Sequence, residues 1–411
     1  MSNASFSFFT PPPEPSRADV PLAAEDAPPR SVLDDPGVLA VASREVRSAV
    51  EAVRRTDFLR SKAWVSLGDG VYKPVNESRD KRAWYAATRS HRPLVTAWDD
   101  EPMEAPNPAV HLPSDALPPA SLVERMVLEL GIPSGPGTRV LEVGTGSGYT
   151  AALLAHMMGP GAVTSVEINP VVAALAERRL ARLHIPVRVV HGAGLDYRHD
   201  GRFERVLVTC GLRTIPHSLI RSVEPGGVLL VPFGPAFMNA QVLVRFTVAE
   251  HRRVHGRIIG PVVQDALPWS FDARHAQPAQ WSPRVPTRHD AVRLPQDFMP
   301  PGFPLGLFVT GLRVRHLHGA LSRGAAGQRI LTLRDTDPAA REPSLAHIAV
   351  GPGRSHATVT EYGPRPLAED VLAAYEWWRA LGKPALSTFK ITVTAKGTRV
   401  WLDTPAKSWP L

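Results

Sequence analysis

Short apolar runs alternate with longer segments of helical composition through the middle of the chain. The runs are rich in β-branched residues and predict strands at 140–143, 162–166, 187–190, 205–208 and 228–231. Between them, 149–158 has the composition of a helix, and 171–183 has an apolar face formed by Val172, Ala173, Ala176, Leu180 and Leu183. Strands separated by helices predict parallel pairing with crossover helices, so we expect an α/β fold with a doubly wound sheet.

A glycine turn joins the first of these strands to its helix. Gly144, Gly146 and Gly148 have the spacing G-x-G-x-G. Such a turn lets a ligand approach the backbone without meeting a Cβ atom, although a purely structural turn also explains three glycines. Glu167 ends the next strand, where a carboxylate can accept the hydroxyls of a ribose, but a solvated loop glutamate fits the position too. Together the turn and the acidic residue favour a nucleotide-like ligand at the carboxyl edge of the sheet.

The flanking segments differ from this core in composition. Residues 1–38 are rich in proline and poor in apolar residues, which predicts a disordered tail. Residues 39–112 predict a helix followed by short strands and loops, 113–250 a ligand-binding domain, and 251–300 a basic, proline-rich linker. Residues 301–411 predict a small α+β domain, with strands at 305–314, 329–333 and 344–350, a helix at 367–381 and a hairpin at 389–402.

Charge and cysteine content narrow the class of protein. The 411 residues carry a net charge of +8, while residues 1–38 alone carry −4, so the remaining chain carries +12. This positive charge favours acidic partners such as an acidic peptide, a nucleic acid or an anionic surface. The charge also increases solubility, which is the alternative explanation. Cys210 is the single cysteine, at the end of a predicted strand, and is expected to be a buried structural thiol. There is no apolar run of membrane-spanning length and no secretory signal pattern, so we expect a cytoplasmic protein without a membrane partner.

Three segments carry a resemblance to a known family. VLEVGTGSGYTAALLA, FERVLVTCGLRTIP and PGGVLLVPFG resemble the protein-L-isoaspartate O-methyltransferases, which are class I S-adenosylmethionine-dependent enzymes with a Rossmann-like sheet. The resemblance covers about 83–234 and implies S-adenosylmethionine as cofactor and a peptide carboxylate, of Asp or isoAsp, as methyl acceptor. It implies that Glu167 holds the ribose, that His191, Gly192 and Ala193 lie beside the adenine, and that Ile168 is a further cofactor contact. The methionine part of the cofactor is expected to be lined by the turn residues Glu142, Gly144, Thr145, Gly146, Ser147 and Gly148.

Two positions depart from the family's usual pattern. The family usually carries a Ser-x-Pro turn that meets the substrate carboxylate, and this chain has Pro118, Pro119 and Ala120 there. Ser114 or Ser121 is the candidate substitute, although Ser121 also suits a helix cap, and Thr209 to Arg213 is expected to form the opposite wall. Ala193 replaces the family's usual Asp, which accepts from the adenine amino group. The loss of this charge-assisted bond is expected to weaken cofactor binding by about 1–3 kcal/mol unless another acceptor replaces it.

The C-terminal part carries a looser resemblance. SLAHIAVGPG, EYGP and the helix with Trp377 and Trp378 are similar to the C-terminal extension of isoaspartate-methyltransferase-like enzymes found with lanthipeptide precursors, including the FxLD type. This implies a modified precursor peptide as partner and succinimide formation after esterification. Repair of isoaspartyl proteins, methylation of a small molecule and an inactive peptide-binding homologue remain as alternatives. Arg and Trp interleave at 251–295, which suits single-stranded nucleic acid, but no nucleic-acid fold accompanies them and this partner is not favoured.

Overall fold

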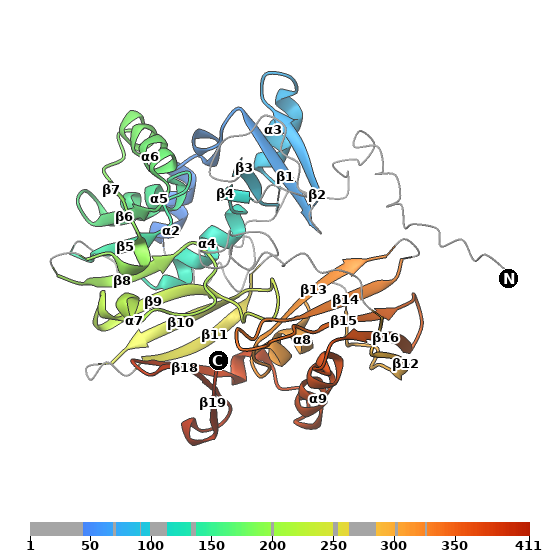
Figure 1. Cartoon of the computed structure of the whole chain (residues 1–411). Helices are drawn as coiled ribbons and strands as arrows, with labels where there is room; N and C mark the ends of the chain where they lie inside the picture. Colours follow the sequence, from blue (N-terminus) through green and yellow to red (C-terminus); the bar gives the residue numbers. More distant parts are fainter. Residues whose placement is uncertain are drawn as a thin grey trace.

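A ten-stranded mixed sheet lies at the centre of the computed structural model (Figure 1). The structure describes residues 44–68, 71–90, 92–98, 113–132, 137–198, 201–249, 254–262, 285–300, 303–324 and 327–411. The predicted tail at 1–38 lies outside these residues. Among the described residues, no helix is long and apolar enough to cross a membrane.

The parallel half of the sheet confirms the predicted α/β core. Its order is β9-β8-β5-β6-β7, formed by β5 (Val140–Val143), β6 (Val163–Glu167), β7 (Arg188–His191), β8 (Phe203–Val208) and β9 (Val223–Phe233). The helices that connect or flank these strands are α4 (Ala120–Leu130), α5 (Tyr149–Met158), α6 (Pro170–Arg182) and α7 (His217–Arg221), with the 3-10 turn η3 (Gly194–Asp196). The strand order reverses at β5, and in such sheets the ligand crevice lies outside the carboxyl ends of the strands at this point.

The antiparallel half of the sheet changes the predicted domain boundaries. It adds β10 (Val242–Val248) and β11 (Val254–Pro261), and then three strands from the end of the chain, β17 (Lys390–Thr394), β18 (Gly397–Trp401) and β19 (Ser408–Pro410). Gly256 in β11 pairs with Ile391 in β17. The expected linker at 251–300 therefore contains a strand of the main sheet, and the expected separate domain at 301–411 contributes three more. Local patterns predicted the hairpin itself, but its partner β11 is more than a hundred residues away in the sequence and leaves no local signal.

A four-stranded sheet and two helices form the N-terminal part. The sheet has the order β2-β1-β3-β4, with β1 (Lys62–Gly68), β2 (Val71–Asn76), β3 (Leu94–Trp98) and β4 (Pro113–Leu117). The helices are α2 (Arg44–Ala52), α3 (Lys81–Thr88) and the 3-10 turn η2 (Arg55–Phe58). The buried Arg55 guanidinium donates to the carbonyl oxygens of Thr88, Leu117 and Pro118. Arg55 thereby fixes the chain between β4 and α4, where the substrate turn was expected.

The second flanking sheet belongs to the C-terminal part, and there one predicted strand is wrong. Its order is β12-β16-β15-β14-β13, with β12 (Arg288–Arg293), β13 (Leu317–Arg323), β14 (Arg329–Asp335), β15 (Leu345–Val350) and β16 (His356–Tyr362), beside α9 (Leu367–Ala380) and the turns η5 (Leu386–Thr388) and η6 (Pro405–Lys407). The predicted strand at 305–314 is instead the helix α8 (Leu305–Gly311), all of whose residues after Leu305 are buried. A helix buried on every side is apolar all round and shows no helical period in its sequence.

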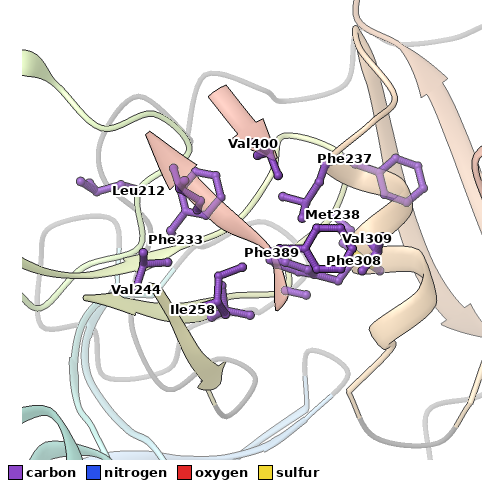
Figure 2. Packing of buried hydrophobic residues seen from close by; sticks show 14 of the residues in the cluster. Leu212, Phe233, Phe237, Met238, Val244, Ile258, Phe308, Val309, Phe389 and Val400 are labelled. Atoms are coloured by element: carbon purple, nitrogen blue, oxygen red, sulfur yellow. The ribbon is translucent and has the colours of Figure 1, made fainter. Parts of the chain in front are cut away.

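One continuous core joins the main sheet to the C-terminal part. Figure 2 shows Phe237 and Met238, which follow β9, among Phe308 and Val309 of α8 and residues of the C-terminal hairpin. Phe237 is 1% exposed, and Phe308 and Phe389 are completely buried. Packing of this density means that the loop after β9 is positioned by the C-terminal part of the chain.

Candidate active site

The glycine turn takes the conformation that its sequence predicted. Gly144, Gly146 and Gly148 have φ values of +98°, +51° and +87°. A Cβ atom on Gly144 would lie 2.5 Å from Oγ1 of Thr209. The Thr209 hydroxyl contacts the carbonyl oxygens of Val143 and Gly144, at 3.0 and 2.5 Å. Thr209 therefore holds the start of the turn, with its side chain engaged by backbone rather than pointing free into a pocket.

Glu167 connects the glycine turn to the end of β6. Its Oε2 accepts from the Gly146 N–H at 2.9 Å, and its Oε1 accepts from the Asn169 N–H at 3.0 Å. The side chain is only 8% exposed, so it is not a solvated loop residue. Burial raises the pKa of Glu167, while the hydrogen bonds from Gly146 and Asn169 oppose the rise. Each oxygen retains a further lone pair, so the carboxylate can accept from a ligand hydroxyl as well.

Glu142 lies beneath the turn and is completely buried. The Ser165 hydroxyl donates to its Oε2 at 2.5 Å, and Ser165 contacts the Thr145 hydroxyl at 2.6 Å. Oε1 of Glu142 has no hydrogen-bond partner among the described residues. Burial raises the pKa of Glu142 to about 8, with the Ser165 bond opposing and the charge of Glu167 adding to the rise. The carboxyl group therefore holds a proton at neutral pH.

Asp115 is a site residue that the sequence reasoning missed. It lies on β4, and a Cβ atom on Gly146 would approach its Oδ1 to 2.9 Å. The Thr96 hydroxyl donates to Asp115, and burial raises the pKa of Asp115 while Thr96 and Arg179 lower it. Arg179 in turn donates from Nη1 to the Ser147 carbonyl at 2.6 Å. A small hollow lies between the N-terminal sheet and the turn, lined by these residues and by Phe58, Arg60, Ala97, Val171, Val172 and Leu175. The only signal in the sequence was a carboxylate next to Ser114 in the short segment before α4.

The two serine candidates are placed differently from the expectation. Ser121 lies in the first turn of α4, and the cap position is taken by Pro119, with no side-chain cap bond among the described residues. The cap role considered for Ser121 is therefore wrong, because α4 begins at Ala120 and Ser121 lies inside its first turn. Ser114 lies on β4, but its side chain is outside the part that the structure describes.

The remaining predicted residues gather at the carboxyl edge of the sheet. Glu167 pairs with His191 across β6 and β7, and the Gly192 N–H donates to the Glu167 carbonyl at 2.9 Å. Ile168 is 53% exposed beside them. Ala193 precedes η3 and offers no polar side chain. The chain thus brings the residues expected at the ribose and at the adenine together on two adjacent strand ends.

Arg213 and Cys210 belong to the segment from Thr209 to Arg213, which was expected to form the opposite wall of the site. Arg213 is half-buried and donates from Nη1 to the carbonyls of Pro235, at 2.5 Å, and Met238, at 3.1 Å. Its Nη2 donates to Oδ1 of Asn239 at 2.7 Å. Burial lowers the pKa of Arg213 to about 10 and raises that of the Cys210 thiol to about 12. The Cys210 thiol therefore stays protonated at neutral pH, although the residue is partly buried rather than fully buried as expected. Arg213 is a fixed cation rather than a mobile surface side chain.

Comparison with known proteins identifies the part of the chain that is shared. Residues 95–263 match the family model "Protein-L-isoaspartate(D-aspartate) O-methyltransferase (PCMT)". A protein-L-isoaspartate O-methyltransferase of Pyrobaculum islandicum is 35% identical over 181 residues, which are 42% of this chain and 83% of that protein. The corresponding protein of Methanopyrus kandleri is 39% identical over 127 residues, 29% of this chain and 56% of that protein. The chain spans little more than half the length of the first curated relatives it matches.

Solved structures of the same description also align with the chain. A structure titled protein-L-isoaspartate O-methyltransferase covers 90% of this chain and 97% of its own, with 16% identity and a TM-score of 0.45. A second, from Plasmodium falciparum in complex with S-adenosyl-L-homocysteine, covers 58% of this chain and 96% of its own, with 15% identity and a TM-score of 0.36.

Proposed function

The chain belongs to the protein-L-isoaspartate O-methyltransferase family, and on that premise we propose that it transfers a methyl group from S-adenosylmethionine to a side-chain carboxylate of a peptide. The observation that carries the proposal is Glu167, a buried carboxylate at the end of β6 that is bonded to the central glycine of the turn. This is the arrangement in which an acidic residue accepts ribose hydroxyls beside a glycine-rich backbone.

The residues at the sheet edge fit S-adenosylmethionine. Gly144 and Gly146 have no room for a Cβ atom, because the Thr209 and Asp115 side chains lie where it would be. Glycine at both positions lets the turn keep its positive φ values, and its backbone is proposed to contact the cofactor. Glu167 is proposed to hold the ribose, with Ile168, Gly192 and Ala193 along the adenine. Thr145, Ser147 and Gly148 are proposed to complete the contact with the methionine part. Oε1 of Glu142 has no hydrogen-bond partner among the described residues. Because Oε2 accepts from Ser165, the carboxyl proton is proposed to lie on Oε1, where it can donate to a ligand acceptor.

No general base is required in this reaction. When bound, the cofactor supplies an electrophilic methyl group on a sulfonium centre. A carboxylate acceptor is already ionised at neutral pH, so the protein contributes position and exclusion of water. Thr209 fixes the turn, and the N-terminal sheet covers it through Asp115 and Thr96. The chain between β4 and α4, held by Arg55, is proposed to position the acceptor carboxylate, with Ser114 and Ser121 as the candidate hydroxyl groups.

We propose tailoring of a peptide natural product as the specific role, with the modified precursor peptide as substrate. Two features support it: Pro118 to Ala120 replace the serine turn of the repair enzymes, and 285–411 add a sheet and two helices beyond the matched segment. In the esterified Asp, the backbone nitrogen of the next residue attacks the ester carbonyl. A C–N bond forms, the C–O bond breaks and methanol leaves, which gives a succinimide. Hydrolysis of this ring yields Asp or isoAsp.

Methyl transfer to matched peptides tests the proposal. The protein is incubated with labelled S-adenosylmethionine and two peptides that differ only in Asp or isoAsp, and base-labile label is counted. Label on Asp is expected for the tailoring role. Label on isoAsp alone would indicate repair instead, and label on neither would refute methyl transfer to these carboxylates.

Calorimetry with S-adenosylhomocysteine tests the cofactor site separately. Glu167→Ala is expected to weaken binding by about ten- to a hundredfold, because charge-assisted hydrogen bonds contribute about 1.5–3 kcal/mol. Glu177→Ala, an exposed glutamate of α6, is the matched control and should bind as the wild type does. Unchanged affinity in the Glu167 variant would refute the ribose assignment.

A further inference from the structure

Two basic side chains of the C-terminal sheet, His318 and Arg334, lie side by side, and Arg213 lies near His318. His318 on β13 and Arg334 on β14 are directly opposite each other in the antiparallel pair. Their neighbours Leu317, Gly319 and Leu333 point to the buried face, so His318 and Arg334 share the other face. Both Arg213 and Arg334 lie close enough to His318 to lower its pKa. We call Arg213, His318 and Arg334 the cationic cluster. It combines one residue that follows β8 of the main sheet with two residues of the C-terminal sheet.

The packing between the two parts fixes this cluster. The Gly319 N–H donates to the Phe237 carbonyl, and a Cβ atom on Gly319 would lie 3.1 Å from the Phe237 ring. On Gly311 a Cβ atom would lie 2.8 Å from both Pro235 and Phe237. The same loop supplies the carbonyls of Pro235 and Met238 to the Arg213 guanidinium. Figure 2 shows Phe237 and Met238 packed beside α8, which holds this loop in place.

We propose that the cationic cluster binds a second carboxylate of the substrate peptide, beside the carboxylate that accepts the methyl group. The proposal rests on the proposed function and assigns the substrate as an acidic peptide. It also gives the C-terminal part a role in the site, since the cluster is incomplete without β13 and β14.

Charge and position support this assignment. Arg213 follows β8 at the carboxyl edge, four residues after Thr209, which contacts the glycine turn. Two guanidinium groups beside one imidazole repel one another, and a bound anion relieves that repulsion. Burial is the main cause that lowers the pKa of His318 to about 4, and the charges of Arg213 and Arg334 lower it further. The imidazole is therefore neutral at pH 7 and can donate one N–H. Guanidinium groups match the fork geometry of a carboxylate, and hydrogen bonds already orient Arg213.

Fluorescence anisotropy with labelled peptides tests the cluster without turnover. The probes are a short peptide of alternating Asp and Gly and its counterpart with Asn in place of Asp. The dissociation constant of the Asp peptide is expected to rise about tenfold in Arg334→Gln and in Arg213→Gln, and that of the Asn peptide to stay unchanged. Arg334→Gln is the cleaner variant, because Arg213 also supports the loop after β9. Arg334→Lys should recover part of the affinity.

Arg354→Gln is the matched control. Arg354 is an exposed arginine beyond the far end of β15, whereas Arg334 pairs with Leu345 at its start. This control removes the same charge and should bind the Asp peptide as the wild type does. The proposal is overturned if the Asp peptide fails to bind the wild type, if Arg334→Gln binds it unchanged, or if Arg354→Gln weakens it equally.

Methyl transfer to the Asp peptide is measured in parallel. Arginine-dependent binding without transfer would leave the cluster in place and refute the methyltransferase activity on this peptide. Transfer with the same KM in wild type and Arg334→Gln would refute the cluster and leave the activity in place.

Discussion

Glu142→Gln isolates the buried carboxyl group under the glycine turn. Glutamine keeps the shape of the side chain and an oxygen that can accept from the Ser165 hydroxyl, but it cannot ionise. In the wild type the pKa of Glu142 is about 8 in the folded chain, against an ordinary value of 4.5. Between these two pH values the folded state binds more protons than the unfolded state. The free energy of unfolding contributed by Glu142 therefore falls as pH rises through this interval.

The size of the effect follows from the same two values. The interval from 4.5 to about 8 spans about 3.5 pH units, and each unit corresponds to about 1.4 kcal/mol. The upper limit for the loss is therefore about 5 kcal/mol, and it is reached above pH 8. Glu142→Gln avoids this loss, so it should be within about 1 kcal/mol of the wild type at pH 5 and several kcal/mol more stable at pH 9.

Urea unfolding at pH 5, 7 and 9 measures the difference. The stability curves of wild type and Glu142→Gln should separate as pH rises, with equal m values. Glu177→Gln removes an exposed carboxylate and should follow the wild type at every pH. Parallel curves for wild type and Glu142→Gln from pH 5 to 9 would refute the buried, protonated state of Glu142.

Two glycine substitutions, with a third as control, test the packing that positions the site. Gly144→Ala places a Cβ atom against Thr209 at positive φ, and we expect a loss of about 2 kcal/mol or more in urea unfolding together with weaker S-adenosylhomocysteine binding. Gly161→Ala has a similar positive φ but open space, so it should cost only about 1 kcal/mol and leave binding unchanged; equal losses would contradict the close approach at Gly144. Gly306→Ala in α8 would overlap the Tyr375 ring and should cost about 1–3 kcal/mol, whereas a fully stable variant would contradict the packing of α8 on α9.

The sequence predicted the parts of the site that are local in the chain. The run at 140–143, the glycine turn and the helix at 149–158 are contiguous, and their strand, positive φ values and helix all follow from residue type. Glu167 could be placed because a parallel strand brings its carboxyl end to the same edge as the previous strand. The burial of Glu167 and its bond to Gly146 are consistent with the ribose role, which remains a proposal.

Interactions between distant segments could not be predicted. Asp115 reaches the turn because β4 pairs with β3 and the N-terminal sheet then packs over Gly146, and neither pairing has a local pattern. The same reason explains Arg213. A single arginine after a strand is typical of a solvated loop, and its fixed position depends on carbonyls more than twenty residues further along the chain.

The C-terminal part is better understood as a completion of the main sheet than as an appended module. The matched segment ends at residue 263, just after β11, which would then be an open edge strand. β17 covers that edge, and Ile391 and Val393 enter the same core as Phe246 and Ile258. α8 and β13 also hold the loop after β9, whose carbonyl groups bind Arg213. The same C-terminal part of the chain therefore both closes the sheet, through β17, and positions Arg213. Stability of the sheet and the geometry of the proposed peptide site therefore depend on the same contacts.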